Sequence, residues 1–159
     1  MSALLIREAS QSDVPLILEF IRKIADYEKL SHAVVASEDT LRKSLFGERP
    51  AAEVLLAYWY EKPAGYAVFF HNFSTFLGRA GMYLEDLFVE PELRGKGIGK
   101  ALLSCVARIT KERECGRLEW SVLDWNKPSI DFYLSLGAKP MDEWTTFRME
   151  QDAITKLAG

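Results

Sequence analysis

The chain has 159 residues, a net charge of −3 and 48% hydrophobic residues, which suits one globular domain with a core of its own. The acidic balance argues against a nucleic-acid-binding surface, and no apolar run reaches the ~20 residues of a membrane-spanning helix. The N-terminus has no basic segment before its short apolar run, so we expect no signal peptide and predict a cytoplasmic protein.

The first part of the chain predicts a strand followed by two helices. Residues 3–7 are apolar and β-prone. Ser12 suits the N-cap of a helix that runs to about Leu30, with its apolar residues at helical spacing. Ser37 is expected to cap a second, shorter helix, which Gly47 ends.

The middle of the chain predicts three strands. Residues 53–60 form the first, residues 61–65 a turn, and residues 66–73 the second. Residues 74–81 are expected to form a wide loop that leads to the third strand, over 82–89.

The rest of the chain predicts helices alternating with strands. A helix is expected over 97–114, a strand over 118–123 and a helix from 128 to 137. A last strand over 145–149 and a helical turn over 152–157 follow. The fold class is therefore α/β or α+β, with helices around a mixed sheet.

A glycine-rich turn, residues 94–99, separates the strand over 82–89 from the next helix. Such an order directs free backbone N–H groups and the positive end of a helix dipole at an anion. The glycines let the backbone approach closely, and Arg94, Lys96 and Lys100 add positive charge. We predict that this turn binds a phosphate group.

Two common phosphate-binding motifs do not fit this turn. In a Walker A motif Arg94 would have to be Gly, and Ala101 would have to carry the hydroxyl that binds Mg²⁺. The dinucleotide fingerprint requires Gly-x-Gly-x-x-Gly, whereas Lys100 stands where its last Gly would be. What remains is Arg-x-x-Gly-x-Gly after a strand that carries the acidic pair Glu85-Asp86.

This pattern resembles the GNAT superfamily of N-acetyltransferases, and within it the diamine branch of spermidine/spermine acetyltransferases and relatives that act on lysine-like amines. The residues that carry the resemblance span nearly the whole chain: Tyr27-Glu28, Tyr83-Leu84-Glu85-Asp86, Phe88-Val89, 94–99, Trp125-Asn126-x-Pro128-Ser129-Ile130-x-Phe132-Tyr133 and Gly137-Ala138. The resemblance implies a single GNAT domain over 1–159, built on a mostly antiparallel central sheet.

The resemblance also implies that acetyl-CoA is the co-substrate. The turn would hold the pyrophosphate, and the strand before it would pair by backbone with the pantetheine arm. A backbone N–H near Phe88 or Val89, where family members have a bulge, would stabilise the carbonyl oxygen. The residues expected to bind acetyl-CoA are Leu87, Phe88, Val89, Arg94, Gly95, Lys96, Gly97, Ile98, Gly99, Lys100, Asn126 and Ser129.

Acetyl transfer to an amine needs a base and an acid. An alkylammonium with a pKa near ~10.4 must lose its proton, and a leaving thiolate of pKa near ~8.5 benefits from one. Glu85 is the candidate base, through a water, and its charge would also attract a cationic amine. Asp86 is expected on the opposite strand face by alternation. On the resemblance, Tyr133 is the candidate acid, and the amine attacks directly in a ternary complex.

Several acidic and aromatic residues are expected around the amine: Tyr27, Glu28, Glu85, Asp86, Glu119, Trp120, Asp124 and Glu143. So many carboxylates favour a substrate with more than one positive charge, and the first prediction is a diamine or polyamine such as spermidine or spermine. Thialysine or another lysine-like amino acid, a protein N-terminus or lysine tail, and a non-catalytic acyl-CoA-binding module remain alternatives.

The remaining features predict partners and metal content. The resemblance and an aromatic content of 12% favour a homodimer. Cys105 and Cys115 match no metal or redox spacing and are expected to be reduced thiols. His32 and His71 are isolated in the sequence, so no metal site is expected.

Overall fold

A computed structural model describes residues 2–159, which divide into two compact units. The first extends to Ser121, and the second comprises Val122–Gly159. Within the described residues, no helix is long and apolar enough to cross a membrane.

The first unit is built on a five-stranded sheet with the strands in chain order. The first four pair antiparallel and the fifth pairs parallel to the fourth, which confirms the mixed, mostly antiparallel sheet. The strands are β1 (Leu4–Glu8), β2 (Glu53–Trp59), β3 (Lys62–Ser74), β4 (Arg79–Val89) and β5 (Leu118–Trp120).

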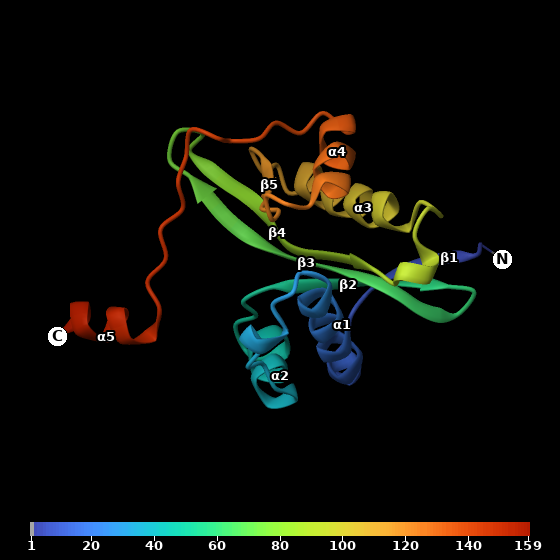
Figure 1. The fold of residues 1–159 in the computed structure, drawn as a ribbon, viewed down its shortest axis with the longest axis horizontal. Coiled ribbons are helices and arrows are strands. Elements are labelled where there is room, and N and C mark those ends of the chain that lie inside the picture. The colour runs from blue at the N-terminus through green and yellow to red at the C-terminus, as the bar shows by residue number, and fades with distance from the viewer. Residues whose placement is uncertain (1) are drawn as a thin grey trace. The chain divides into compact units, whose positions relative to one another are not determined.

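Helices cover both faces of this sheet (Figure 1). The helices α1 (Val14–Tyr27) and α2 (Glu38–Phe46) lie on one face, and α3 (Ile98–Glu112) lies on the other. Short 3₁₀ turns cover Gln11–Asp13, Ser31–Ala33 and Pro91–Leu93.

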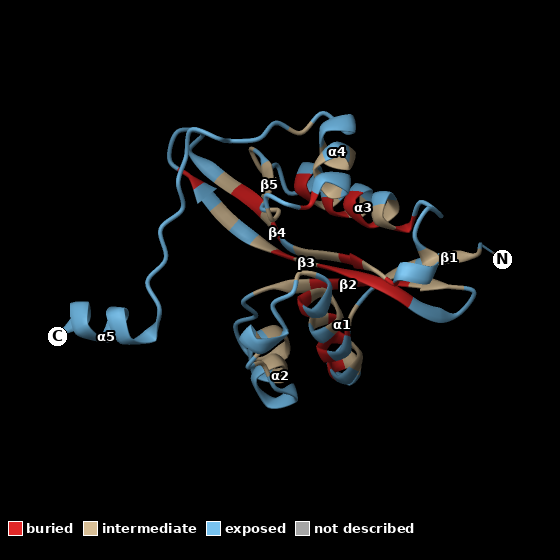
Figure 2. Cartoon of the chain, viewed as in Figure 1, coloured by how far each residue is buried: buried red, intermediate tan, exposed pale blue. Residues whose placement is uncertain are grey.

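Apolar side chains of α1 and the sheet form the core on the α1 face. Figure 2 shows buried residues where the helices and strands of this unit face one another. The cluster on the α1 side consists of Ile17, Phe20, Val54, Leu56, Tyr66 and Phe88.

The second unit holds α4 (Lys127–Ser135) and α5 (Gln151–Ala158), as the helical periodicity predicts. The predicted strand over 145–149 is wrong, because these residues join no ladder. A strand requires a hydrogen-bonded neighbour, and no described segment pairs with these residues. Phe147 in this segment is 92% exposed.

The β2–β3 hairpin is tighter than predicted. Trp59 pairs directly with Lys62, so the predicted turn over 61–65 is wrong. Tyr60 and Glu61 form the turn with φ of 46° and 68°. Two successive positive φ values are the mark of a type I′ turn, which matches the twist of the flanking strands.

The β3–β4 hairpin is longer than predicted. Pairing continues out to Ser74 and Arg79, so half of the predicted loop over 74–81 belongs to the two strands. Conversely, β5 is shorter than the predicted strand over 118–123, because its ladder with β4 involves only Leu118–Trp120.

The start of α1 also differs from the prediction. Ser12 is not the N-cap; the chain first makes a 3₁₀ turn in which the Ser10 amide donates to the Asp13 carboxylate at 2.7 Å. Asp13 is then the N-cap of α1, and its carboxylate also binds Arg7 through two hydrogen bonds of 2.8 and 2.9 Å.

Candidate functional site

The glycine-rich turn takes the conformation that an anion site requires. Gly95 and Gly97 both have φ of +82°, and Gly97 is the N-cap of α3. L-residues avoid this region, so glycine is favoured here for its backbone freedom. A Cβ at either position would meet no atom within 4 Å, so the backbone of the turn is accessible to a ligand. The first turn of α3 offers N–H groups that lack helical partners, and a phosphate fits this arrangement.

Arg94 connects the turn to the end of α1 as well as adding charge. Its Nε donates to the Val89 carbonyl at 3.1 Å. The guanidinium carbon lies 4.7 Å from the centre of the Tyr27 ring and 6.0 Å from that of Phe88. Cation–π contacts of this length hold the guanidinium beside Tyr27, which the sequence assigns to the amine.

The strand before the turn has a partly open edge. The ladder between β4 and β5 ends where Leu84 pairs with Trp120. Residues 85–89 of β4 therefore lie against β3 on one side, while β5 does not cover their other edge. Main-chain groups along such an edge can hydrogen-bond an extended amide-containing ligand, as expected for Leu87, Phe88 and Val89.

A β-bulge lies at Glu85 and not at the predicted position near Phe88 or Val89. Asp86 pairs with Val68 and Leu84 with Phe69, so Glu85 is the extra residue of β4. Pairing at Phe88 and Val89 is regular. The extra residue breaks the alternation that would put Glu85 and Asp86 on opposite faces.

Three carboxylates, those of Glu28, Glu85 and Asp86, are close enough to act on one another. Burial raises the pKa of Glu28, and the negative charges of Asp86 and Glu85 raise it further. Burial also raises the pKa of Asp86. Glu28 is the C-cap of α1, so the helix end and the bulged strand bring the three acids together. We call them the acid trio.

Tyr66 belongs to the same cluster, although sequence reasoning assigned it no role. Its ring is completely buried, and its hydroxyl donates to Asp86 Oδ2 at 2.6 Å. Burial and the charges of Asp86, Glu28 and Glu85 raise its pKa well above the ordinary value. Only the β3–β4 register, with Tyr66 opposite Phe88, brings this residue near Asp86; no spacing in the sequence signals it.

Two further predicted residues of the amine site lie on β5. Trp120 pairs with Leu84, and Glu119 pairs with Tyr83. The Glu119 carboxylate accepts a hydrogen bond from Asn72 at 3.3 Å and lies 3.5 Å from the Arg117 guanidinium. The polar partners of Glu119 are therefore Asn72 and Arg117.

The remaining predicted site residues belong to the second unit. Asn126 is buried as the N-cap of α4, where its Oδ1 accepts from the Ser129 amide at 3.4 Å. Tyr133 is half-buried in α4, with its ring 5.6 Å from that of Phe132. Asp124 and Glu143 are exposed. The structure does not relate these residues to the acid trio.

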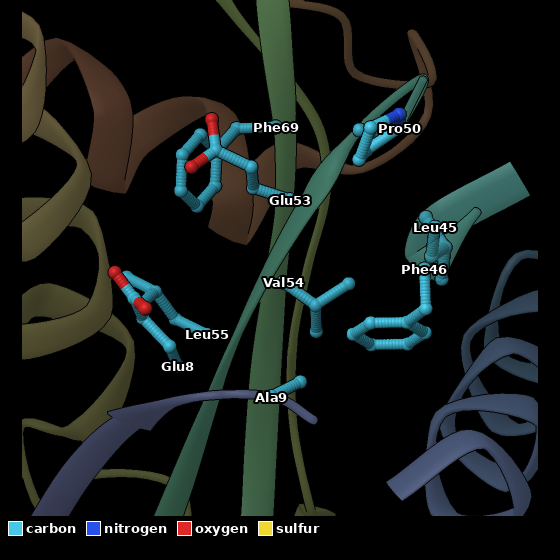
Figure 3. Close-up of a pocket in the computed structure, with 10 residues that line it drawn as sticks. Glu8, Ala9, Leu45, Phe46, Pro50, Glu53, Val54, Leu55 and Phe69 are labelled. Carbon is cyan, nitrogen blue, oxygen red and sulfur yellow. The ribbon is translucent and has the colours of Figure 1, made fainter. Parts of the chain in front are cut away.

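The first unit also contains two hollows. An open groove of about 640 Å³ runs along α1 and includes Tyr27 and Phe88 in its lining. A smaller pocket of about 120 Å³ lies where β1 ends and β2 begins, with Phe46 of α2 beside it (Figure 3). No predicted site residue lines the smaller pocket. Among the described residues, no group of His, Cys, Asp or Glu is arranged to hold a metal ion.

The chain matches the Acetyltransferase (GNAT) family over residues 19–138. It is 41% identical over 170 residues to a thialysine N-epsilon-acetyltransferase of Sus scrofa, covering 100% of this chain and 99% of the relative. It is 29% identical over 163 residues to spermidine/spermine N(1)-acetyltransferase-like protein 1 of Homo sapiens, covering 96% of this chain and 23% of that longer protein.

A solved structure supports the same fold. An integron cassette protein from the mobile metagenome of V. cholerae superposes with a TM-score of 0.82 at 29% identity, over 99% of both chains. The glycine-rich turn at the start of α3, the sheet and the sequence match agree with one another, and the chain belongs to the GNAT family of acetyltransferases.

Proposed function

We propose that this acetyltransferase moves the acetyl group of acetyl-CoA to a primary amine of a small cationic molecule, a lysine-like amino acid such as thialysine ahead of diamines and polyamines. The acid trio carries the proposal, because it gathers three carboxylates, and Tyr27, next to Glu28 in the chain, contacts Arg94 of the glycine-rich turn. The thialysine relative, which is more similar than the spermidine/spermine-like one, sets the order of substrates.

The glycine-rich turn and β4 supply most of the residues that would hold acetyl-CoA. Gly95, Gly97 and the first turn of α3, with Lys96 and Lys100, would bind the pyrophosphate. The open edge of β4 would pair with the pantetheine arm, and Asn126 and Ser129 are proposed to meet the same arm. When bound, acetyl-CoA supplies the activated acetyl thioester.

The chain's own residues would manage the protons and the charge. Glu85 would take the proton of the ammonium through a water, and Glu28 and Asp86 would attract the cationic substrate. The pKa values of Glu28 and Asp86 are raised, and a cationic substrate beside these carboxylates would favour their ionised forms. Tyr133 would protonate the leaving thiolate.

A CoA-release assay tests the proposal with a panel of thialysine, lysine, ornithine, spermidine, a neutral-tailed primary amine and a histone-tail peptide. We expect thialysine to react with the highest kcat/KM and the neutral-tailed amine with the lowest. Glu28→Gln should raise KM for thialysine and leave KM for acetyl-CoA nearly unchanged. Glu61→Gln, in the β2–β3 turn, is the control and should change neither.

The outcomes separate the candidate functions. Highest activity on spermidine would favour a polyamine as the substrate, and the acid trio would still be the group that attracts the cation. Equal activity on the neutral-tailed amine would refute the preference for cations. Binding of acetyl-CoA without CoA release for any amine would favour a non-catalytic acyl-CoA-binding module. The homodimer remains part of the proposal on the family resemblance, and the cytoplasmic location remains part of it as the sequence predicts.

A further inference from the structure

A buried hydroxyl on β3 has no evident role in packing. Tyr66 is 0% exposed and its ring lies 5.4 Å from that of Phe20, which in turn lies 5.7 Å from the ring of Phe88. A phenylalanine at position 66 could make the same ring contacts without burying a hydroxyl, which is costly unless it is hydrogen-bonded. A role for the hydroxyl must therefore come from its hydrogen bond to Asp86.

The bond between Tyr66 and Asp86 has the geometry of a charge-assisted hydrogen bond. The distance of 2.6 Å from the hydroxyl to Asp86 Oδ2 lies in the range for an O–H donor on a carboxylate. Burial alone raises the pKa of Asp86, and the Tyr66 hydrogen bond acts in the opposite direction. Tyr66 therefore favours the ionised form of Asp86.

The other charged groups near Tyr66 make its hydrogen bond to Asp86 more important for keeping that carboxylate ionised. Glu28 at the end of α1 and Glu85 on β4 both act on Tyr66 with negative charge, as Asp86 does. Burial disfavours the charge on Asp86, and two neighbouring carboxylates add to this, so Asp86 would tend to bind a proton if it lacked the hydrogen bond from Tyr66. A protonated Asp86 would attract a cationic amine much less strongly.

We propose that Tyr66 is a positioning residue of the amine site, which holds the Asp86 carboxylate ionised and in one orientation toward the cationic substrate. This inference rests on the proposed function. The bulge at Glu85 contributes, because it sets the register in which Asp86 lies opposite Val68 and within reach of Tyr66.

The first test compares Tyr66→Phe with Tyr58→Phe. Tyr58 is a matched control: it is a half-buried tyrosine of β2, and its hydroxyl accepts a hydrogen bond from Arg7 at 2.8 Å. Tyr66→Phe should raise KM for the cationic amine by about tenfold, with KM for acetyl-CoA changed less than about twofold. Tyr58→Phe should change neither. Equal effects of the two variants on the amine KM would overturn the inference.

A pH series separates positioning from a structural role. Below its pKa Asp86 is neutral, and losing the hydrogen bond raises that pKa. The ratio of kcat/KM for wild type over that for Tyr66→Phe should therefore increase as the pH is lowered toward the pKa of Asp86 in the variant. The deprotonation of the amine itself affects both kcat/KM values equally, so it cancels in the ratio. A ratio that is independent of pH would count against Tyr66 acting through the charge of Asp86.

A double-mutant cycle provides the decisive comparison. If Tyr66 acts through Asp86, Tyr66→Phe should have less than about a twofold effect on the amine KM in an Asp86→Asn background. An undiminished tenfold effect there would overturn the inference. A ¹³C-carboxyl NMR titration, which does not depend on turnover, should show a higher Asp86 pKa in Tyr66→Phe than in wild type; an unchanged pKa would also overturn it.

The proposed function and the role of Tyr66 can fail separately. A wild-type chain that acetylates no amine would refute the proposed function and, with it, the positioning of an amine. An active wild type whose Tyr66→Phe variant retains the wild-type amine KM would refute only the role of Tyr66.

Discussion

At the scale of single residues, the proposed chemistry depends most on a carboxylate and a hydroxyl that belong to different units. Glu85 is exposed at a bulge, where its carboxylate can reach solvent and a water molecule. Tyr133 is half-buried on α4, and its phenol is proposed to give a proton to the departing thiolate. The two roles predict different kinetic consequences, because only Tyr133 is assigned to the leaving group.

Tyr133→Phe should therefore lower kcat by about 10²-fold with little change in KM for either substrate, because general acid catalysis acts in the transition state. Steady-state CoA release measures this. The control is Tyr60→Phe, in the β2–β3 turn and 69% exposed, which should retain full activity. A wild-type kcat in Tyr133→Phe would remove Tyr133 from the mechanism.

The ion pair between Arg7 and Asp13 predicts how stability depends on pH. The Arg7 guanidinium lowers the pKa of Asp13 from 3.8 to about 2. A depressed pKa stabilises the folded state above the unfolded pKa, and the contribution is lost as the pH falls from about 4 through about 2. Asp13→Asn should cost about 1 kcal/mol at neutral pH, since Arg7 is partly exposed, and almost nothing at pH ~2.

Urea unfolding of wild type and Asp13→Asn at several pH values tests this expectation. Asp39→Asn is the control, because the Asp39 side chain is 96% exposed in its pair with Arg42 and should contribute almost nothing at any pH. A difference between wild type and Asp13→Asn that does not shrink in acid would contradict the assigned role of the ion pair.

At the scale of elements, the role of the turn before α3 in binding acetyl-CoA can be tested separately from its effect on stability. Gly97 and Gly78 both have positive φ, +82° and +68°, and a methyl group added at either position would meet no neighbouring atom. Alanine at either should cost about 1 kcal/mol of stability for the same backbone reason. Only Gly97→Ala should also raise KM for acetyl-CoA, because Gly78 lies in the β3–β4 turn.

Thermal unfolding and acetyl-CoA kinetics on the two glycine variants give the comparison. The matched loss of stability shows that any difference in KM comes from the site. If both variants change the acetyl-CoA KM equally, the effect comes from the fold, and the turn loses its assignment as the pyrophosphate site.

Elements with a local signal were predictable from the sequence. The helices α1, α2 and α3 follow from apolar periodicity, and the Gly97 turn follows from its glycines and its position between a strand and a helix. The predicted strand over 145–149 failed because its β-prone residues say nothing about whether a neighbouring strand exists. The bulge at Glu85 and the bond from Tyr66 to Asp86 depend on register, a relation between distant segments that no local pattern contains.

At the scale of the whole molecule, exposed apolar side chains of the second unit are the proposed contact of the predicted homodimer. Met141, Trp144, Phe147, Met149, Ile154 and Leu157 are all at least 49% exposed. Exposed apolar side chains that gather in one patch commonly mark contacts with another chain. A second copy of this chain is the partner that the family resemblance favours.

Sedimentation equilibrium at micromolar concentration should give twice the chain mass of 18.1 kDa. Phe147→Asp should shift the mass toward the monomer, because a charge would have to be buried at the contact. Phe76→Asp is the control: Phe76 is 91% exposed, against 92% for Phe147, and lies in the β3–β4 turn. A monomer mass for the wild type would refute the homodimer.

The short ladder between β4 and β5 has a consequence for how the protein exchanges hydrogen with solvent. The amides of residues 85–89 that point away from β3 are not covered by β5, so they should exchange with deuterium much faster than those of the ladder between β2 and β3. An acyl-CoA lying along this edge would slow them selectively. Mass spectrometry of a peptide over 85–89, with and without acetyl-CoA, would then record the ligand as protection of one strand edge; equal uptake in both states would place the ligand elsewhere.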